Sequence, residues 1–350
     1  MARLRILLFS FNSPLVALLL LPILCGVAIA EPHPIAKAQF ITIGGIQQWV
    51  TIRGNDRTKP VLIFLHGGPG DAQSALVTTY APYEKNFVLV QWDQRNAGRT
   101  LGHYSSEFQP TSLNQVITDG IELTTYVRKH LHTNRVILMG HSWGSFLGVQ
   151  MVKRRPDLFN AYVGIGQVTS WREVVEAQYR YTLEKAKAKS DPAAVKELET
   201  LGIPPLDNFD QYMVLRRQLN QYVAASDAAW LQQSWSLNSA QLSASDFLAY
   251  QKGLFQMADL LPVLTSMDTR AVGLKFEIPM FLVQGDEDHI VDTNTAVLYF
   301  GQIQAPIKHT TLIEGAGHFV MATHAEKVAD AIHEDMLLVP SRSNDRRSHN

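Results

Sequence analysis

The sequence predicts an α/β protein with a mostly parallel central sheet flanked by helices. Short continuous apolar runs, such as residues 61–65, are typical of strands buried on both faces of a parallel sheet. Longer stretches with helical spacing separate these runs, so the strands need crossover connections. With 350 residues, 46% of them hydrophobic, the chain is long enough to bury one large core.

The elements can be predicted in chain order. Residues 40–53 alternate like an antiparallel pair that turns at Gly44-Gly45. Buried strands are expected at 61–65, 87–90, 135–139, 161–165, 280–283 and 310–313, and helices notably at 113–131, 146–154 and 325–338.

One region interrupts the alternation of strands and helices. Residues 169–275 show helical spacing without a clear buried strand, which predicts a helical cap inserted after the sixth core strand. The catalytic core would then consist of two parts, residues 31–168 and 276–340. The polar tail 341–350 cannot bury apolar surface, so we expect it to be disordered.

The first thirty residues have the pattern of a cleaved secretory signal. Arg3 and Arg5 precede an apolar stretch that ends in Ala28-Ile29-Ala30, small residues at the positions that a signal peptidase reads. We therefore expect an exported protein, periplasmic or secreted, without stable membrane insertion after cleavage; a retained N-terminal anchor is the alternative. Cys25 is the only cysteine, so the mature chain would contain no thiol.

Charge excludes one class of function. The formal net charge is −1 and basic residues are not clustered, so no nucleic-acid-binding stripe is expected. Neither charge nor composition predicts an oligomeric state.

A strand-to-helix turn provides the candidate nucleophile. Gly140-His141-Ser142-Trp143-Gly144 follows a predicted buried strand and precedes a helical pattern, the context in which G-x-S-x-G forms a sharp turn. The turn projects the hydroxyl of Ser142 above the sheet edge, at the N-terminus of a helix. Flanking glycines are needed because side chains there would clash.

A serine hydroxyl needs a base, and the base needs an orienting acid. His318 directly follows the last predicted strand, so it is the candidate base. The acid is expected after the preceding strand, where Asp288 lies three residues beyond Gly285. Asp286 and Asp292 remain as alternatives, although Asp286 is better suited to brace the turn.

Acyl transfer also needs donors for the developing oxyanion. The backbone N–H of Trp143, directly after the nucleophile, is one expected donor. The other is expected from the glycine-rich loop 66–70, where we choose Gly68.

These motifs together resemble the prolyl iminopeptidase branch of the α/β-hydrolase superfamily. The chain has His66-Gly67-Gly68-Pro69-Gly70, then Asp93-Gln94-Arg95-Asn96-Ala97-Gly98-Arg99, then the Gly140–Gly144 turn followed by Ser145, in the order that the family shows. The resemblance implies an α/β-hydrolase fold and a Ser-His-Asp enzyme that releases N-terminal residues, often proline, from peptides.

The resemblance also implies that cap glutamates bind the free amino group of the substrate. Glu173 and Glu176 are the candidates, with Glu184 as a further alternative, and Trp235 is expected at the substrate. The chain departs from the family here, because Trp235 is followed by Ser236 where the family would have a glutamate.

The sequence therefore predicts an acyl-enzyme mechanism at Ser142 on a small peptide substrate, without metal or organic cofactor. A carboxylesterase or lactonase acting on small esters would use the same residues. The non-enzyme alternative is a catalytically inactive binding protein on the same fold.

Overall fold

The computed structural model describes residues 33–340 apart from 106, 109–110, 207 and 256–259. The predicted signal peptide 1–30 and the predicted disordered tail 341–350 lie outside these described residues. Within the described part of the chain, no helix is both long enough and apolar enough to cross a membrane.

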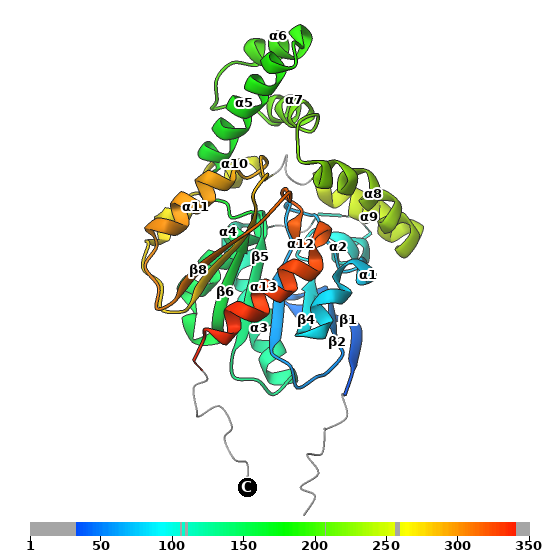
Figure 1. Ribbon diagram of the computed structural model, residues 1–350. Helices are drawn as coiled ribbons and strands as arrows, with labels where there is room; N and C mark the ends of the chain where they lie inside the picture. Colours follow the sequence, from blue (N-terminus) through cyan, green and yellow to red (C-terminus); the bar gives the residue numbers. More distant parts are fainter. Residues whose placement is uncertain (1–32, 106, 109–110, 207, 256–259, 341–350) are drawn as a thin grey trace, which may run out of the picture. The chain divides into compact units, whose positions relative to one another are not determined.

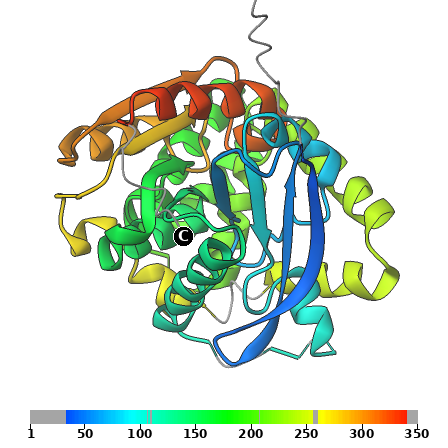
Figure 2. The same ribbon diagram turned by 90° about the horizontal axis from the view of Figure 1, so that it is seen from below.

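The described residues form an eight-stranded sheet (Figures 1 and 2). Its strands are β1 (Ile35–Ile43), β2 (Ile46–Gly54), β3 (Val61–Leu65), β4 (Val88–Trp92), β5 (Val136–His141), β6 (Phe159–Ile165), β7 (Met280–Gly285) and β8 (Lys308–Ile313). The spatial order is β1-β2-β4-β3-β5-β6-β7-β8. Pairing is antiparallel from β1 to β2 and from β2 to β4, and parallel between all other neighbours. The predicted mostly parallel sheet is confirmed.

Helices cover both faces because each central strand is apolar on both sides. In β3, Leu62 and Phe64 pack into one buried cluster, whereas Ile63 and Leu65 pack into the other. The helices of the core are α1 (Val77–Tyr80), α2 (Gly98–His103), α3 (Leu113–His130), α4 (Trp143–Arg154), α11 (Thr293–Gln302), α12 (Val320–Thr323) and α13 (Ala325–Leu337), with 3-10 turns η1 (Ala81–Lys85) and η2 (Pro156–Leu158). Side chains of α3, α4 and α11 share the cluster of Ile63, and those of η1, α12 and α13 share the cluster of Leu62.

The described chain between β6 and β7 folds into helices that stand over one edge of the sheet (Figure 1). They are α5 (Trp171–Ala188), α6 (Pro192–Leu201), α7 (Phe209–Leu219), α8 (Ala225–Gln241), α9 (Ala244–Leu254) and α10 (Leu261–Thr265), followed by η4 (Thr269–Val272). The side chain of Ser170 caps α5, and Asp191 caps α6 just before a proline in its first turn. Helices α5, α6 and α7 bury a small apolar cluster of their own.

The parallel strands end at the sheet edge that lies below these helices (Figure 1). In open α/β sheets, ligands bind outside the carboxyl ends of the strands. The loops after β3, β5, β7 and β8 carry the residues predicted from the sequence, so the fold brings distant segments to one place.

Candidate active site

Ser142 occupies a strained turn between β5 and α4. Its φ of 52° is positive, a conformation that residues other than glycine rarely adopt. The backbone N–H of Ser142 donates to the carbonyl of Ile165 at 2.9 Å, which fixes the turn to the end of β6. The turn is thus held in a conformation that costs energy, as is common at functional sites.

Close packing explains the glycines on either side of this turn. A Cβ at Gly140 would lie 2.4 Å from the carbonyl oxygen of Gly144. A Cβ at Gly144 would lie 2.1 Å from the carbonyl oxygen of Leu65, at the end of β3. Both contacts are with backbone atoms, which cannot move aside without distorting helix α4 or strand β3.

The loops after β7 and β8 bring Asp288 and His318 together. Nδ1 of His318 lies 2.8 Å from Oδ2 of Asp288, and both side chains are buried. The other carboxylate oxygen of Asp288 accepts the backbone N–H groups of Ile290 and Val291 at 2.9 and 2.8 Å. These bonds orient Asp288, which in turn orients the imidazole.

The two alternative acids have other contacts. Oδ1 of Asp286 accepts the backbone N–H of Gly315 at 2.8 Å, so Asp286 ties the loop after β7 to the loop after β8. Asp292 caps α11, where it accepts the backbone N–H of Thr295 at 2.8 Å. Of the three acids, Asp288 is the one that contacts His318.

Burial controls the protonation of the pair. It lowers the pKa of His318 below the ordinary value, because the charged imidazole loses its hydration in the site. Burial also raises the pKa of Asp288, although the backbone N–H groups of Val291 and Ile290 oppose this shift. His318 is therefore neutral near pH 7, the form that can accept a proton.

The two predicted oxyanion donors lie beside Ser142. Gly68 and Trp143 line a small hollow together with Ser142. Trp143 is the first residue of α4, where a backbone N–H has no acceptor within the helix. Gly68 has a φ of 107°, and a Cβ there would lie 2.5 Å from the backbone nitrogen of Gly70.

A cavity of about 390 Å³ opens over Ser142 and His318, between the sheet edge and the cap. Its aromatic lining comprises Phe209, Tyr212, Trp230, Trp235, Tyr250, Phe255 and Phe319. Its polar lining includes Asp71, Gln73, Arg216, Asn220 and Asn238. A mostly apolar cavity with a few placed polar groups is typical of a site for a small molecule.

Comparison with known proteins identifies the family of the chain. A family model described as the alpha/beta hydrolase fold matches residues 60–325. The chain belongs to this family.

Individual relatives indicate which branch of the family the chain belongs to. A probable aminopeptidase of Bacillus subtilis (strain 168) is 28% identical over 297 residues, which cover 83% of this chain and 93% of the relative. A probable proline iminopeptidase of Streptomyces coelicolor is 35% identical over 122 residues, 35% of this chain and 36% of the relative. These relatives confirm the predicted resemblance: the chain is an α/β-hydrolase of the prolyl iminopeptidase-like branch.

A solved structure supports the fold. The crystal structure of a proline iminopeptidase-related protein from Thermus thermophilus superimposes with a TM-score of 0.62 at 18% identity. The match covers 87% of this chain and 98% of that protein. At this identity the likeness shows the α/β-hydrolase fold alone.

The structure does not bring the predicted cap glutamates of this hydrolase to the cavity. Glu173 contacts Nη1 of Arg270 at 2.8 Å, and Glu176 contacts Nε of Arg172 at 2.7 Å. Both glutamates line a separate surface hollow on α5. Trp235, by contrast, lines the cavity over Ser142 with 43% of its surface exposed.

Sequence reasoning missed Asp227. This buried residue of α8 accepts the backbone N–H of His318 at 2.7 Å and that of Phe319 at 3.0 Å. An aspartate in the first turn of a helix usually serves that helix, so no local signal pointed to this role. The cap of the hydrolase thus contacts the loop that carries His318.

Sequence reasoning also missed the residue that holds the oxyanion loop. The side chain of Gln94 donates to the carbonyl of His66 at 3.2 Å and accepts the indole N–H of Trp143 at 3.1 Å. It therefore links the loop of Gly68 to the helix that starts at Trp143. The sequence could have indicated Gln94, because it lies in one of the three motifs that the chain shares with the family.

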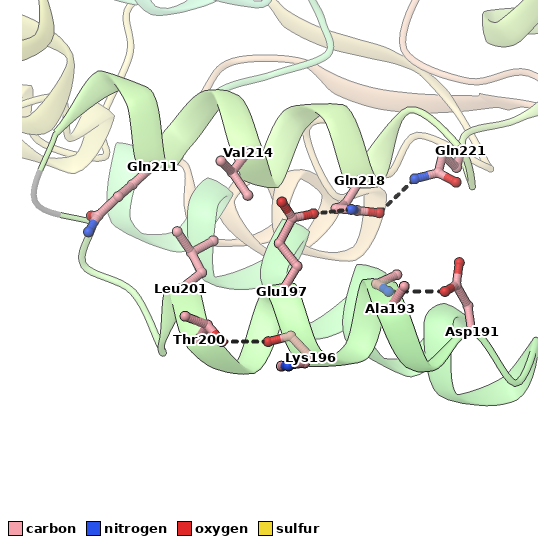
Figure 3. A pocket seen from close by; sticks show the side chains of 11 residues that line it. Asp191, Ala193, Lys196, Glu197, Thr200, Leu201, Gln211, Val214, Gln218 and Gln221 are labelled. Atoms are coloured by element: carbon pink, nitrogen blue, oxygen red, sulfur yellow. Dashed lines mark hydrogen bonds between the residues drawn. The ribbon is translucent and has the colours of Figure 1, made fainter.

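A larger hollow, of about 770 Å³, lies between α6 and α7 of the cap (Figure 3). The carboxylate of Glu197 on α6 accepts a hydrogen bond from Gln218 on α7, and Gln218 accepts one from Gln221 at 2.6 Å. None of the residues predicted for the site lines this hollow. The hydrogen bond between Glu197 and Gln218 joins α6 to α7 and contributes to the packing of the two cap helices.

In the part of the chain that the structure describes, no group of three or more His, Cys, Asp or Glu side chains is placed to hold a metal ion. The geometry described above can serve acyl transfer with protein groups alone.

Proposed function

We propose that this hydrolase is an aminopeptidase that works through an acyl-enzyme on Ser142. His318 takes the proton of Ser142 as the hydroxyl attacks the carbonyl carbon of the first peptide bond. The backbone N–H groups of Gly68 and Trp143 stabilise the oxyanion. His318 then gives the proton to the leaving amine, and water hydrolyses the ester bond with the same base.

The contact between Asp288 and His318 supports the two proton transfers. Asp288 holds the imidazole so that Nε2 is left to exchange protons with Ser142, and its charge stabilises the imidazolium that forms. The strained turn at Ser142 supports the role of the hydroxyl as nucleophile.

One observation carries the assignment of the substrate: the carboxylate of Asp71 lines the cavity that contains Ser142 and His318. Asp71 accepts hydrogen bonds from the hydroxyl of Tyr250 at 3.1 Å and from Gln73 at 2.9 Å. Burial raises the pKa of Asp71, because the carboxylate is poorly hydrated there. A cation that reached this carboxylate would bind to it. A free N-terminal amine is such a cation, and Asp71 would bind it in place of a cap glutamate.

A small apolar hollow supports a compact first residue. It measures about 40 Å³, adjoins Ser142 and Gly68, and is lined by apolar groups that include Val168, Leu264 and Ile290. A hollow of this size beside the nucleophile favours a small apolar group next to the scissile carbonyl.

The test compares alanine p-nitroanilide with its N-acetyl form and with p-nitrophenyl butyrate. We expect the purified enzyme to cleave the unblocked amide, and Ser142→Ala to abolish this activity. Asp71→Asn should reduce the preference for the unblocked amide about tenfold, since a charged hydrogen bond is lost. Asp210→Asn, an exposed cap aspartate, is the matched control and should leave the preference unchanged.

Three results would contradict the proposal. Equal cleavage of the blocked and unblocked amides would show that the enzyme does not recognise the free amine of its substrate. Cleavage of the ester alone, still dependent on Ser142, would instead establish a carboxylesterase. A wild-type enzyme that cleaves none of the three and does not react with a fluorophosphonate probe would favour a binding protein.

We also infer that the chain is exported. The basic start, the apolar stretch and the Ala28-Ile29-Ala30 sequence support this inference. Expression of the full chain followed by N-terminal sequencing of the exported form tests it. A mature N-terminus at Glu31 is expected, whereas a full-length protein in the membrane fraction would favour the retained anchor.

A further inference from the structure

An arginine without a counter-charge among the described residues lines the active-site cavity. Arg216, on α7, is half-buried and lines the same cavity as Ser142 and His318. Its Nη1 atom is buried and has no hydrogen-bond partner in the described part of the chain. Nor does any described carboxylate lie within ion-pair distance of its guanidinium group.

The next residue of the helix shows the contrast. Arg217 is 62% exposed, points to α6 and forms an ion pair with Glu197. Buried charges in proteins are usually paired, because a charge that loses its hydration needs a counter-charge. Arg216 lacks one within the described chain, and it lines the cavity in which a ligand would supply one. The planar guanidinium favours a carboxylate, which it can bind through two parallel hydrogen bonds.

The position of Arg216 relative to His318 indicates which part of the substrate it meets. Burial is the main cause of the lowered pKa of His318, and the positive charge of Arg216 lowers this pKa further. Arg216 also acts to lower the pKa of Asp288, against the larger effect of burial. Arg216 and His318 line the same cavity, whereas neither lines the small hollow beside Ser142 and Gly68, so the guanidinium lies on the His318 side of the site. His318 protonates the leaving group, so this is the side on which the leaving amine departs.

We infer that Arg216 binds the C-terminal carboxylate of a short peptide, on the leaving-group side of the scissile bond. The inference rests on the proposed aminopeptidase function and defines its substrate class. In a dipeptide, a single carbon separates the leaving nitrogen from the carboxylate, so both lie on the side of His318. Asp71 and Arg216 then bind the two charged ends of one zwitterionic peptide.

The test compares peptides that differ only in the charge of the C-terminus. Alanyl-alanine and alanyl-alaninamide are incubated with the full chain, and the loss of each intact peptide is measured by mass spectrometry. The variants are Arg216→Met, which removes the charge, and Arg216→Lys, which keeps it. Arg217→Met is the matched control, from the adjacent position on the same helix. Circular dichroism verifies that each variant is folded.

We expect the wild-type enzyme to cleave alanyl-alanine about ten to a hundred times more efficiently, in kcat/KM, than the amide. In Arg216→Met the ratio should fall to about one, through loss of activity on the acid alone. Arg216→Lys should recover part of the ratio, and Arg217→Met should keep all of it. The wild-type ratio is itself a readout that does not depend on the folding of any variant.

The outcomes separate this inference from the proposed function. If both peptides are cleaved equally by the wild-type enzyme, or if the preference survives in Arg216→Met, the inference is wrong and the aminopeptidase stands. If Arg216→Met slows both peptides by the same factor, Arg216 acts on the catalytic pair and not on the carboxylate, which also overturns the inference. If neither peptide is cleaved while p-nitrophenyl butyrate is, both the inference and the aminopeptidase assignment fail.

Discussion

Asp227 and His318 are joined by a hydrogen bond of 2.7 Å from the backbone N–H of His318 to the Asp227 carboxylate. Asp227 belongs to the cap and His318 to the loop after the last strand, 91 residues further along the chain. The second oxygen of the carboxylate accepts the next backbone N–H, from Phe319. The cap therefore holds the backbone of the residue that we propose as the base.

Asp227→Asn tests this positioning role. The amide keeps one acceptor but loses the other, so the loop loosens and kcat/KM should fall about tenfold or more, since small displacements of a catalytic group are costly. Burial lowers the pKa of His318, and the negative charge of Asp227 opposes this shift. Removing the charge should therefore move the acid limb of the pH–rate profile to lower pH.

The exposed cap aspartate Asp210 provides the control for that measurement. Asp210→Asn should change neither kcat/KM nor the pH profile. If Asp227→Asn lowers the melting temperature but leaves the pH profile in place, Asp227 serves the fold and not the base.

The acid of the triad can be identified by three matched substitutions. Asp288→Asn should lower kcat by about four orders of magnitude, because the imidazole loses its orienting partner and adopts the wrong tautomer. Asp286→Asn and Asp292→Asn alter neighbouring acids with structural contacts, and should cost about tenfold at most. Steady-state kinetics on one substrate measures the loss of kcat in each of the three variants. A larger loss in Asp286→Asn than in Asp288→Asn would reverse the assignment.

The wild-type enzyme should stay active in mildly acidic solution. Only neutral His318 can accept the proton of Ser142, and burial lowers the pKa of His318 from its ordinary value of 6.5. The fraction of neutral His318 therefore falls only at a pH below 6.5, and an acid limb of kcat/KM set by His318 should lie there. Burial raises the pKa of Asp288 to about 7, so a limb near that pH would report the carboxyl group instead. Rates between about pH 4 and pH 9, with circular dichroism as a check on folding, test this. An acid limb centred above the ordinary histidine pKa would contradict it.

Gly317 leaves the space that the Asp227 carboxylate occupies. A Cβ at this position would lie 2.2 Å from Oδ2 of Asp227. Gly317→Ala should therefore lower the free energy of unfolding by about 1–3 kcal/mol, as overpacking does, and should lower kcat/KM as the loop moves. Thermal unfolding and kinetics measure both effects.

Gly301, in α11, is the matched control. A Cβ there would have no neighbour within 4 Å, so Gly301→Ala should change the free energy of unfolding by no more than about 1 kcal/mol. It should leave activity unchanged. Equal effects of the two substitutions would show that the contact with Asp227 is unimportant.

Much of the core could be predicted from the sequence because its signals are local. The strand predicted at 61–65 is β3 itself, and the helix predicted at 113–131 is α3. Strands buried on both faces read as continuous apolar runs, and helices show their own period. The same holds for the turn at Ser142, whose glycines, preceding strand and following helix are neighbours in the chain.

The sequence by itself thus determined the α/β-hydrolase fold and the candidates Ser142, Asp288 and His318, since each follows a recognisable strand. Only the tertiary structure decided which of the three candidate acids contacts His318 and which cap residues line the cavity. Glu173 faces Arg270 outside the cavity, whereas Arg216 lines it, although both lie on charged helices of similar pattern. The periodicity of a helix shows that it has a buried face, but the partner of that face depends on how the cap packs on the core.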